Sequence, residues 1–220
     1  RTGPRPSVWR TETGDGREEV FSMSIILASQ SPRRRQVLGQ IGLDHFIVRP
    51  ARGEEIMDPA LSPAQLVEEL SRQKAREVAG ASDPGDLVIA ADTVVAIDGR
   101  VLGKPHDREE ACAMLSALSG REHTVYTGVT VCRDDRMLTQ HEATQVRFRP
   151  LSPREIRAYV DSGEPMDKAG AYGVQELGAL LVEGIRGDYF NVVGLPLCRL
   201  GQMLSQFGVE LLAGKEEQKL

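Results

Sequence analysis

The stretch that decides the fold is SIILASQSPRRRQVLGQIG, residues 24–42. It starts with an apolar, strand-like run, passes through a short polar turn, and continues with three consecutive arginines before apolar positions resume. Ser31 followed by Pro32 is typical of a helix N-cap and first turn, and Gly42 is typical of a helix end. The stretch therefore predicts a strand over 24–29 and a helix over 32–41.

The rest of the chain alternates between strand and helix patterns. Ser-Pro pairs open two more helices, Asp98-Gly99 is a strong two-residue hairpin signal, and Asp107 with Glu110 forms a capping box. We expect strands over 46–49, 87–97, 100–102, 123–132, 140–149 and 178–186, with the turn RDDRM before 140–149, and helices over 62–79, 107–118, 153–160 and 196–207. This order predicts one α/β domain with a mixed, mostly extended β-sheet flanked by helices.

The composition is that of an ordinary globular domain, with 220 residues of which 40% are hydrophobic and 27% are charged. A net charge of -5 argues against general nucleic-acid binding, which usually needs a basic face. No apolar run approaches the roughly 18 residues that a membrane-spanning helix needs, and the start lacks the apolar core of a signal peptide. We expect a cytoplasmic protein that binds neither nucleic acid nor membranes.

The two ends of the chain differ from the middle. Residues 1–22 have no apolar period and are rich in Gly, Pro and Thr, so we expect a disordered extension, with Met23 as an alternative start. The tail 211–220 is expected to fray. The folded domain is therefore predicted to span 23–210.

The cysteines and histidines show no spacing typical of metal ligands or disulfides. The 3 cysteines are odd in number, widely spaced and set in apolar segments, which is typical of reduced core thiols. All of these side chains are interpreted as structural: Cys112, Cys132, Cys198, His45, His106, His123 and His141.

The opening stretch has the features of an anion site. A strand that runs into a tight turn and a helix presents backbone N–H groups and the positive end of the helix dipole. Ser29 and Ser31 add hydroxyl groups, and Arg33 and Arg34 can fold back over the turn to bind phosphate. Cations at this helix end cost stability unless something negative compensates. The alternative is a solvated face with an ordinary Ser-Pro cap, and the stretch alone leaves both interpretations open.

Two further positions carry charge where apolar residues are expected. Lys74 lies on the core-facing stripe of its helix, although a lone lysine there usually reaches the surface. Asp92 and Thr93 interrupt LVIAADTVVAI, the most apolar strand, and a buried carboxylate costs several kcal/mol unless it is paired or bound to a metal. An ideal hairpin at Asp98-Gly99 places Lys104 across from Thr93, near Asp92.

A helix N-terminus with arginines, two misplaced lysines and a buried aspartate together describe a pocket for a polyanion with a metal ion or an activated water. Polyphosphate is the natural ligand. The motifs LASQSPRR, AADTVV, GKP, LSGREHTVYTGV, SGEPMDKAGAYGVQ and VVGLPL occur in this order over about residues 24–207. The sequence thereby resembles the Maf family of nucleoside triphosphate pyrophosphatases, and its Arg-Arg and AYGVQ elements resemble the dTTP/UTP branch.

The resemblance implies a Maf/ITPase-like fold with a central nucleotide-binding cleft. It also implies hydrolysis of dTTP, UTP and related modified pyrimidine nucleotides to a monophosphate and pyrophosphate, as housekeeping of the nucleotide pool. It assigns Asp92 as the catalytic carboxylate, Glu55 or its neighbour Glu54 as a second acid, and Lys74 and Lys104 as phosphate lysines. The positions that set base specificity are Arg33, Thr93 and Gln175.

These assignments lead to a mechanistic hypothesis. Asp92 and Glu55 hold Mg²⁺ or Mn²⁺, Asp92 helps to deprotonate the attacking water, and the cations stabilise charge on the phosphates. Gln175 offers the donor and acceptor needed to read uracil and thymine. The alternative is a nucleotide-binding regulator of cell division and septum formation without significant turnover. A homodimer is the family expectation.

Overall fold

The computed structural model describes residues 8–12, 18–54, 56 and 58–212. In this part of the chain the main sheet has seven strands in the order β4-β3-β5-β7-β8-β9, with β6 paired to β5 as well. The strands are β3 (Ile25–Leu27), β4 (Phe46–Val48), β5 (Leu87–Ile97), β6 (Arg100–Leu102), β7 (Glu122–Arg133), β8 (Arg136–Phe148) and β9 (Val182–Arg186). β3 runs parallel to β4 and β5, and the other pairs are antiparallel, so the predicted mixed α/β sheet is confirmed.

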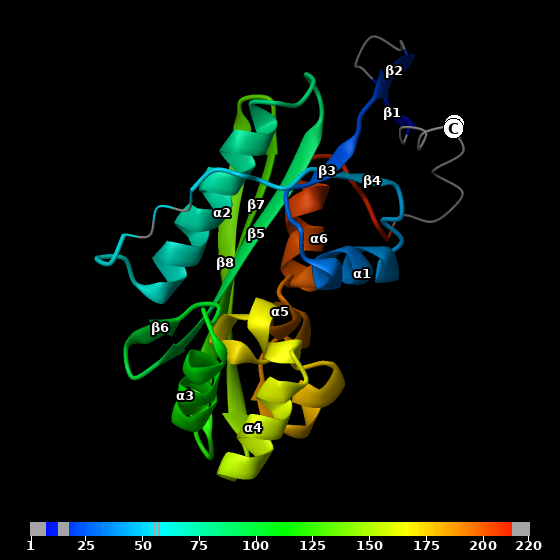
Figure 1. The fold of residues 1–220 in the computed structure, drawn as a ribbon. Helices are drawn as coiled ribbons and strands as arrows, with labels where there is room; N and C mark the ends of the chain where they lie inside the picture. Colours follow the sequence, from blue (N-terminus) through cyan, green and yellow to red (C-terminus); the bar gives the residue numbers. More distant parts are fainter. Residues whose placement is uncertain (1–7, 13–17, 55, 57, 213–220) are drawn as a thin grey trace.

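Helices cover both faces of this sheet (Figure 1). They are α1 (Pro32–Gln40), α2 (Pro63–Ala79), α3 (Arg108–Leu118), α4 (Pro153–Asp161), α5 (Tyr189–Val193) and α6 (Leu197–Ser205). α2 crosses β5, β7 and β8 on one side, α1 and α6 lie on the other side, and α3 and α4 lie toward the opposite end of the long strands (Figure 1).

The alternation of side chains along β5 divides the interior into four clusters. Toward α1 and α6, Leu87, Ile89 and Ala91 belong to one core, whereas Val95 and Ile97 belong to a second core with α3 and α4. On the α2 face, Val88 and Ala90 belong to one small cluster and Val94 to another. On the first face, Thr93 lies between the two large cores. On the α2 face, Asp92 lies between the two small clusters. The polar centre of the strand therefore lies at a junction between hydrophobic cores.

One edge of β5 has a gap beside these two residues. β3 pairs with Leu87–Ile89 and β6 pairs with Val95–Ile97 on the same edge, because β7 occupies the other edge. Within the described ranges no strand pairs with 90–94 on the open edge. The turn after β3 and the turn after β6 both approach this gap, so their side chains converge on the centre of β5.

Gly128 lets α2 approach the sheet closely at this level. It is the β7 partner of Asp92, and a Cβ atom at Gly128 would overlap the carbonyl group of Val67 on α2. Any larger residue would push α2 away from the sheet. Because Lys74 lies on the same helix, this close packing brings it to Asp92.

Most predicted elements are confirmed within one or two residues, and two differ. β8 starts at Arg136, before the predicted 140, because the hairpin turn needs only Asp134 and Asp135. The predicted strand over 178–186 begins as a 3₁₀ helix, Glu176–Leu180, and only Val182–Arg186 is extended. α5 was not predicted.

Each of the last two differences has a local cause. The Glu164 carboxylate accepts hydrogen bonds from the backbone N–H groups of Leu177 and Gly178, which holds that turn in a helical form. Asp188 caps α5 by accepting from the N–H groups of Phe190 and Asn191.

The ends of the chain are described only in part. In the extension 1–22, β1 (Val8–Glu12) and β2 (Glu18–Ser22) form an antiparallel pair in a sheet of their own, and the disorder expected for this extension stays a prediction. Residues 1–7 and 13–17 lie outside the described residues, as do 213–220 of the tail. The domain limits 23–210 stay a prediction.

Candidate active site

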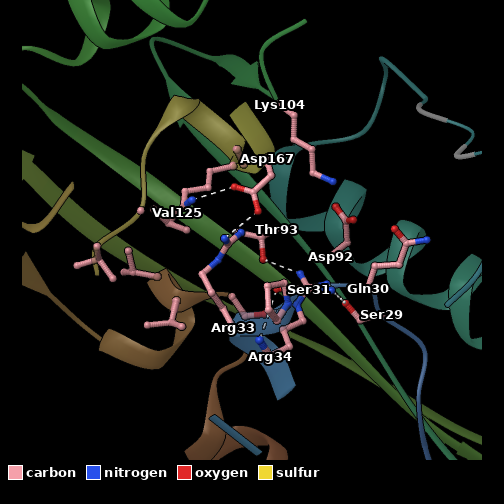
Figure 2. Close-up of a pocket in the computed structure, with 18 of the residues that line it drawn as sticks. Ser29, Gln30, Ser31, Arg33, Arg34, Asp92, Thr93, Lys104, Val125 and Asp167 are labelled. Carbon is pink, nitrogen blue, oxygen red and sulfur yellow. Dashed lines mark hydrogen bonds and ion pairs between the residues drawn. The ribbon is translucent and has the colours of Figure 1, made fainter. Parts of the chain in front are cut away.

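A pocket of about 410 Å³ opens at the gap in the sheet edge, which is within the usual size range of small-ligand sites. Its floor is the centre of β5. We call residues 28–34 its turn wall and residues 167–175 its loop wall, and the turn after β6 and the end of α5 complete it (Figure 2).

The turn wall is closed by its own serines. The Ser29 hydroxyl accepts from the N–H of Ser31 at 3.2 Å, and the Ser31 hydroxyl accepts from the N–H of Arg34 at 3.4 Å. Pro32 has no N–H to offer. Two of the backbone donors predicted to bind an anion are therefore used inside the turn, so side chains supply most of the positive charge of this wall.

Arg34 joins the turn wall to two other segments, β5 and the chain at Gly194. Its guanidinium donates to the Ser29 hydroxyl and to the carbonyl of Ala91 at 3.1 and 2.8 Å, to the carbonyl of Gly194 at 2.7 Å, and to the Thr93 hydroxyl at 3.1 Å. The bond to Ala91 occupies a carbonyl on the open edge of β5. Arg34 thus acts as a structural clamp at the gap, whereas its predicted phosphate contact stays a prediction.

The floor of the pocket presents two polar side chains on opposite faces of β5. Asp92 forms an ion pair with Lys74 of α2, and both side chains are largely buried, with 12% and 16% of their surface exposed. Thr93 shares a hydrogen bond of 2.9 Å with the Thr127 hydroxyl, which donates to the carbonyl of Asn191 at 3.0 Å. The two charges that interrupt apolar patterns in the sequence, Lys74 and Asp92, therefore pair with each other.

Lys104 enters the pocket from the turn after β6, on the side of Asp92 (Figure 2). The ladder between β5 and β6 ends at Val95 and Leu102, two residues before the predicted pairing of Thr93 with Lys104. Lys104 nevertheless lines the same pocket as Thr93 and Asp92. Its side chain belongs to an exposed residue, so its ammonium group is available to a ligand.

The loop wall brings a carboxylate and a second lysine. Asp167 accepts from Arg33 of α1 at 3.0 Å and from Lys168 at 2.8 Å (Figure 2). Partial burial works to raise the pKa of Asp167, but Lys168 and Arg33 outweigh it and hold that pKa below its usual range. Lys168 is 11% exposed and also donates to the carbonyl of Glu164. Gln175 and Tyr172 complete the wall.

The balance of charge in the pocket favours a polyanion. Among the residues that line it, five are cationic and two are carboxylates. The five are Arg33, Arg34, Lys74, Lys104 and Lys168. Because the whole chain carries a net charge of -5, the positive pocket is a local feature and not a property of the surface.

The atoms that line the pocket indicate which metal ions could bind there. The lining has oxygen donors and no His or Cys, which suits Mg²⁺ or Mn²⁺ rather than zinc. Across the described residues there is no cluster of three or more His, Cys, Asp or Glu. Mg²⁺ is commonly held by one or two carboxylates together with substrate phosphates, so Asp92 fits as one such ligand.

The second predicted acid, Glu55, lies outside the described residues, and Glu54 is exposed and does not line the pocket. α2 holds the chain on both sides of that position. Glu77 accepts from the N–H groups of Arg52 and Gly53, and Gln73 accepts from the N–H of Ile56 at 3.2 Å. The helix that carries Lys74 thus also holds this loop.

All the described residues that were predicted for the site meet in one pocket: Ser29, Ser31, Arg33, Arg34, Lys74, Asp92, Thr93, Lys104 and Gln175. Sequence reasoning missed four that join them, namely Gln30, Asp167, Lys168 and Tyr172. A signal was present in DKAGAYGVQ, where an acid and a lysine precede two glycines outside any helical or strand period.

The predicted structural role of the cysteines and histidines needs one correction. The three cysteines are free, and Cys132 is buried, but Cys198 is exposed on α6 and is not a core thiol. Burial raises the pKa of the Cys132 thiol to about 11. Among the histidines, His123 is the buried one, and burial lowers its pKa to about 4.

Comparison with known proteins identifies the family of this chain. Residues 24–207 match the Maf-like protein family. The chain belongs to the Maf family. A dTTP/UTP pyrophosphatase of Symbiobacterium thermophilum is 54% identical over 190 residues, which cover 86% of this chain and 97% of that protein. Proteins of the same name from Pelotomaculum thermopropionicum and Clostridium perfringens are 53% and 47% identical, each over 86% of this chain and over 98% and 100% of their own lengths.

Among solved structures, a HAM1 protein from Coxiella burnetii aligns with a TM-score of 0.48 at 19% identity, over 84% of this chain and 99% of that one. A dITP/XTP pyrophosphatase from Mycobacterium abscessus aligns with a TM-score of 0.40 at 13% identity, over 84% and 97%. In the described part of this Maf protein no helix is long and apolar enough to cross a membrane.

Proposed function

We propose that this Maf protein hydrolyses dTTP and UTP to the nucleoside monophosphate and pyrophosphate. The observation that carries the proposal is the carboxylate of Asp92, paired with Lys74 and surrounded by further cations at the floor of a nucleotide-sized pocket. Relatives near 50% identity over nearly their whole length carry the name dTTP/UTP pyrophosphatase, which supports the same substrates here.

The reaction needs a positioned water and neutralised phosphates more than it needs covalent chemistry by the protein. Lys74 donates a hydrogen bond to Oδ1 of Asp92, and Oδ2 of the same carboxylate is proposed to accept the proton of a water. The water oxygen bonds to the α phosphorus, and the bond to the α–β bridging oxygen breaks. Lys104 enters the pocket on the side of Asp92 (Figure 2), where it can stabilise the departing pyrophosphate.

A divalent cation, Mg²⁺ or Mn²⁺, held by Asp92 and Glu55 together with the substrate phosphates, would supply charge neutralisation and a more acidic water. The oxygen donors of the lining support this choice. The chain's own cations supply the remaining neutralisation.

Base selection is proposed for Gln175, with Arg33 and Thr93. The amide of Gln175 has an NH₂ donor group and a carbonyl acceptor, which match the O4 acceptor and the N3–H donor of uracil and thymine. Cytosine presents the reverse pattern. Arg33 reaches the loop wall through Asp167, so it connects the side of the pocket that holds Gln175 to the helix that follows the turn wall.

Nothing in the described residues favours the alternative of a division regulator without turnover. A protein that only binds a triphosphate gains nothing from a carboxylate beside the three phosphates, because like charges repel. The presence of Asp92 in the pocket therefore supports turnover. A homodimer, the cytoplasmic location and the absence of nucleic-acid binding stay predictions.

The first experiment identifies the bond that is cut. The protein is incubated with UTP, Mg²⁺ or Mn²⁺ and ¹⁸O-labelled water, and we expect UMP carrying the label together with unlabelled pyrophosphate. Label in pyrophosphate would mean attack at the β phosphorus, and release of inorganic phosphate with UDP would mean a different bond. Binding of UTP without any product would favour the regulator.

The matched variants are Asp92→Asn and Asp135→Asn, the second being an exposed turn residue. Removing a general base typically costs about 10²- to 10⁴-fold in rate, so Asp92→Asn should lose at least that much of kcat while Asp135→Asn keeps full activity. Wild-type kcat in folded Asp92→Asn would remove Asp92 from the mechanism.

A further inference from the structure

The loop wall has an unusual backbone. Gly170 and Ala171 follow one another with φ of 67° and 59°, both in the left-handed region. Glycine adopts this region freely, but alanine does so rarely and at a cost, and Ala171 is fully buried. Such a conformation persists only where surrounding contacts hold it. The loop wall therefore depends on anchors elsewhere in the fold.

Tyr172 is the anchor that reaches deepest. Its side chain is 5% exposed and its hydroxyl lies 2.7 Å from Nε2 of His123 on β7. The two rings also meet Phe148 of β8 edge to face, with centroids 4.7 Å apart for Phe148 and Tyr172 and 5.0 Å for His123 and Phe148. One side of Tyr172 thus belongs to the core around α3 and α4, while another lines the pocket.

A histidine at position 123 lowers the stability of the fold if its only role is to pack in the core. It is 3% exposed, and its Nδ1 has no hydrogen-bond partner in the described part of the chain. A buried polar atom without a partner destabilises the fold, so an apolar side chain of similar size would pack there at lower cost. What His123 adds over such a residue is the hydrogen bond to the Tyr172 hydroxyl.

Other contacts hold the backbone of the loop wall but not the orientation of Tyr172. The N–H of Gly170 donates to the carbonyl of Gly103 at 2.9 Å, next to Lys104, and the N–H of Gly173 donates to the Tyr159 hydroxyl at 3.2 Å. Loss of the bond between His123 and Tyr172 should therefore loosen the loop wall without unfolding the domain.

We propose that His123 is a positioning residue for base selection, which acts through Tyr172 to hold Gln175 and Lys168 of the loop wall toward the substrate. His123 does not line the pocket itself. This inference rests on the proposed pyrophosphatase function. It goes beyond that function because it places a determinant of selectivity inside the core. The nucleotide does not contact the side chain of this residue, His123 of β7.

The experiment compares four variants by their ratio of kcat/KM for UTP over CTP, by KM for UTP, and by Tm. Tyr172→Phe keeps the ring and removes the hydroxyl, and His123→Leu removes the partner. His123→Gln keeps a polar group that can reach the hydroxyl. Ile156→Val is the control, because it removes a methyl group from the same core without touching a hydrogen bond of the loop wall.

We expect the UTP to CTP ratio to fall roughly three- to tenfold in Tyr172→Phe and His123→Leu, which corresponds to the loss of one hydrogen bond that orients the wall. KM for UTP should rise more than kcat falls. His123→Gln should recover most of the ratio, and Ile156→Val should keep it even at an equal loss of Tm. A purely structural role predicts that the ratio follows Tm in all four variants.

The inference is overturned if Tyr172→Phe and His123→Leu keep the wild-type ratio, or if Ile156→Val loses it to the same extent. Failure of the proposed function is seen separately, as a wild-type protein that makes no UMP from UTP. In that case the ratio of UTP to CTP dissociation constants, measured by calorimetry on the same variants, takes the place of kcat/KM with the same expected and contradicting outcomes.

Discussion

The turn wall and the loop wall face the same pocket but are held in different ways. Residues 28–34 are fixed mostly by near neighbours, since the hydroxyls of Ser29 and Ser31 close the turn that starts α1. Residues 167–175 have left-handed backbone in their middle and are fixed by distant residues on β7 and α4. A ligand that touches both walls therefore contacts one surface whose shape depends on neighbouring residues in the sequence. The shape of the other surface depends on packing in the core around His123 and Tyr172.

The largest effect is expected at Arg34, which ties the turn wall to β5 and to Gly194. Arg34→Ala leaves the carbonyls of Ala91 and Gly194 without their donor, at a cost of roughly 3 kcal/mol or more. Thermal unfolding should show a Tm lower by roughly 6–12 °C, and kcat/KM for UTP should fall with it.

Arg35 is the matched control for this change, because it is the next residue of α1 and is exposed. Arg35→Ala should change stability by no more than about 0.5 kcal/mol. An equal, small effect of both substitutions would mean that Arg34 is not the clamp of the turn wall, and would return it to its predicted role as a phosphate contact.

The loop wall should be most sensitive to a substitution that changes its backbone conformation. Gly170→Ala forces a side chain into the left-handed region and places a Cβ atom 2.8 Å from a methyl group of Val95. We expect a loss of about 2–4 kcal/mol in the free energy of unfolding, measured by urea denaturation.

Gly201→Ala is the control, because that glycine lies within α6 and a Cβ there meets nothing within 4 Å. Alanine favours a helix interior over glycine, so this variant should gain roughly 0.5–1 kcal/mol. If Gly170→Ala proved as stable as the wild type, the conformation of the loop wall would not depend on that glycine.

The two walls also differ in how far the sequence alone predicts them. The strand, the Ser31-Pro32 cap and the helix of the turn wall follow from local patterns, and so does the anomaly of Asp92 inside an apolar strand. The hairpin at Asp98-Gly99 indicated the approach of Lys104. Each of these signals lies within about ten residues of the feature that it predicts.

The loop wall gives no such signal. Its shape depends on Val95 and His123, which lie tens of residues before it along the chain, and on Tyr159, which precedes Gly173 by 14 residues. No periodicity in the segment itself shows that Asp167 would meet Arg33 or that Lys168 would be largely buried. The gap between β3 and β6 was likewise not predicted, because it depends on two short strands that pair with the same edge of β5.

A change of pH should act on the loop wall through its anchor. Burial holds the pKa of His123 at about 4 in the folded protein, below the value of about 6.5 in an unfolded chain. The unfolded state therefore binds the proton first as the pH falls, and stability declines between pH 6.5 and pH 4. The predicted loss from this group between pH 8 and pH 5 is about 2 kcal/mol.

Tyr172 is the titratable group that faces His123, and burial raises its pKa, so it stays neutral over this range. Urea denaturation at pH 8 and pH 5 tests the prediction when the wild type is compared with His123→Gln, which has no proton to gain. Both proteins contain the same carboxylates, so the difference isolates the imidazole. An equal pH dependence in the two proteins would contradict the buried, neutral state of His123.

The smallest expected effect is also the one that decides which wall reads the base. The lining contains two amides, Gln175 in the loop wall and Gln30 in the turn wall. A lost neutral hydrogen bond is worth roughly 0.5–1.5 kcal/mol, so Gln175→Ala should lower kcat/KM for UTP by about two- to tenfold and leave the turnover of CTP nearly unchanged. Gln30→Ala should keep the UTP to CTP ratio. The reverse result would place the base against the turn wall, beside Asp92 (Figure 2), and the phosphates against Lys168. That arrangement would leave Asp92 far from the α phosphorus, so this pair of substitutions tests both the orientation of the nucleotide and the bond at which it can be cut.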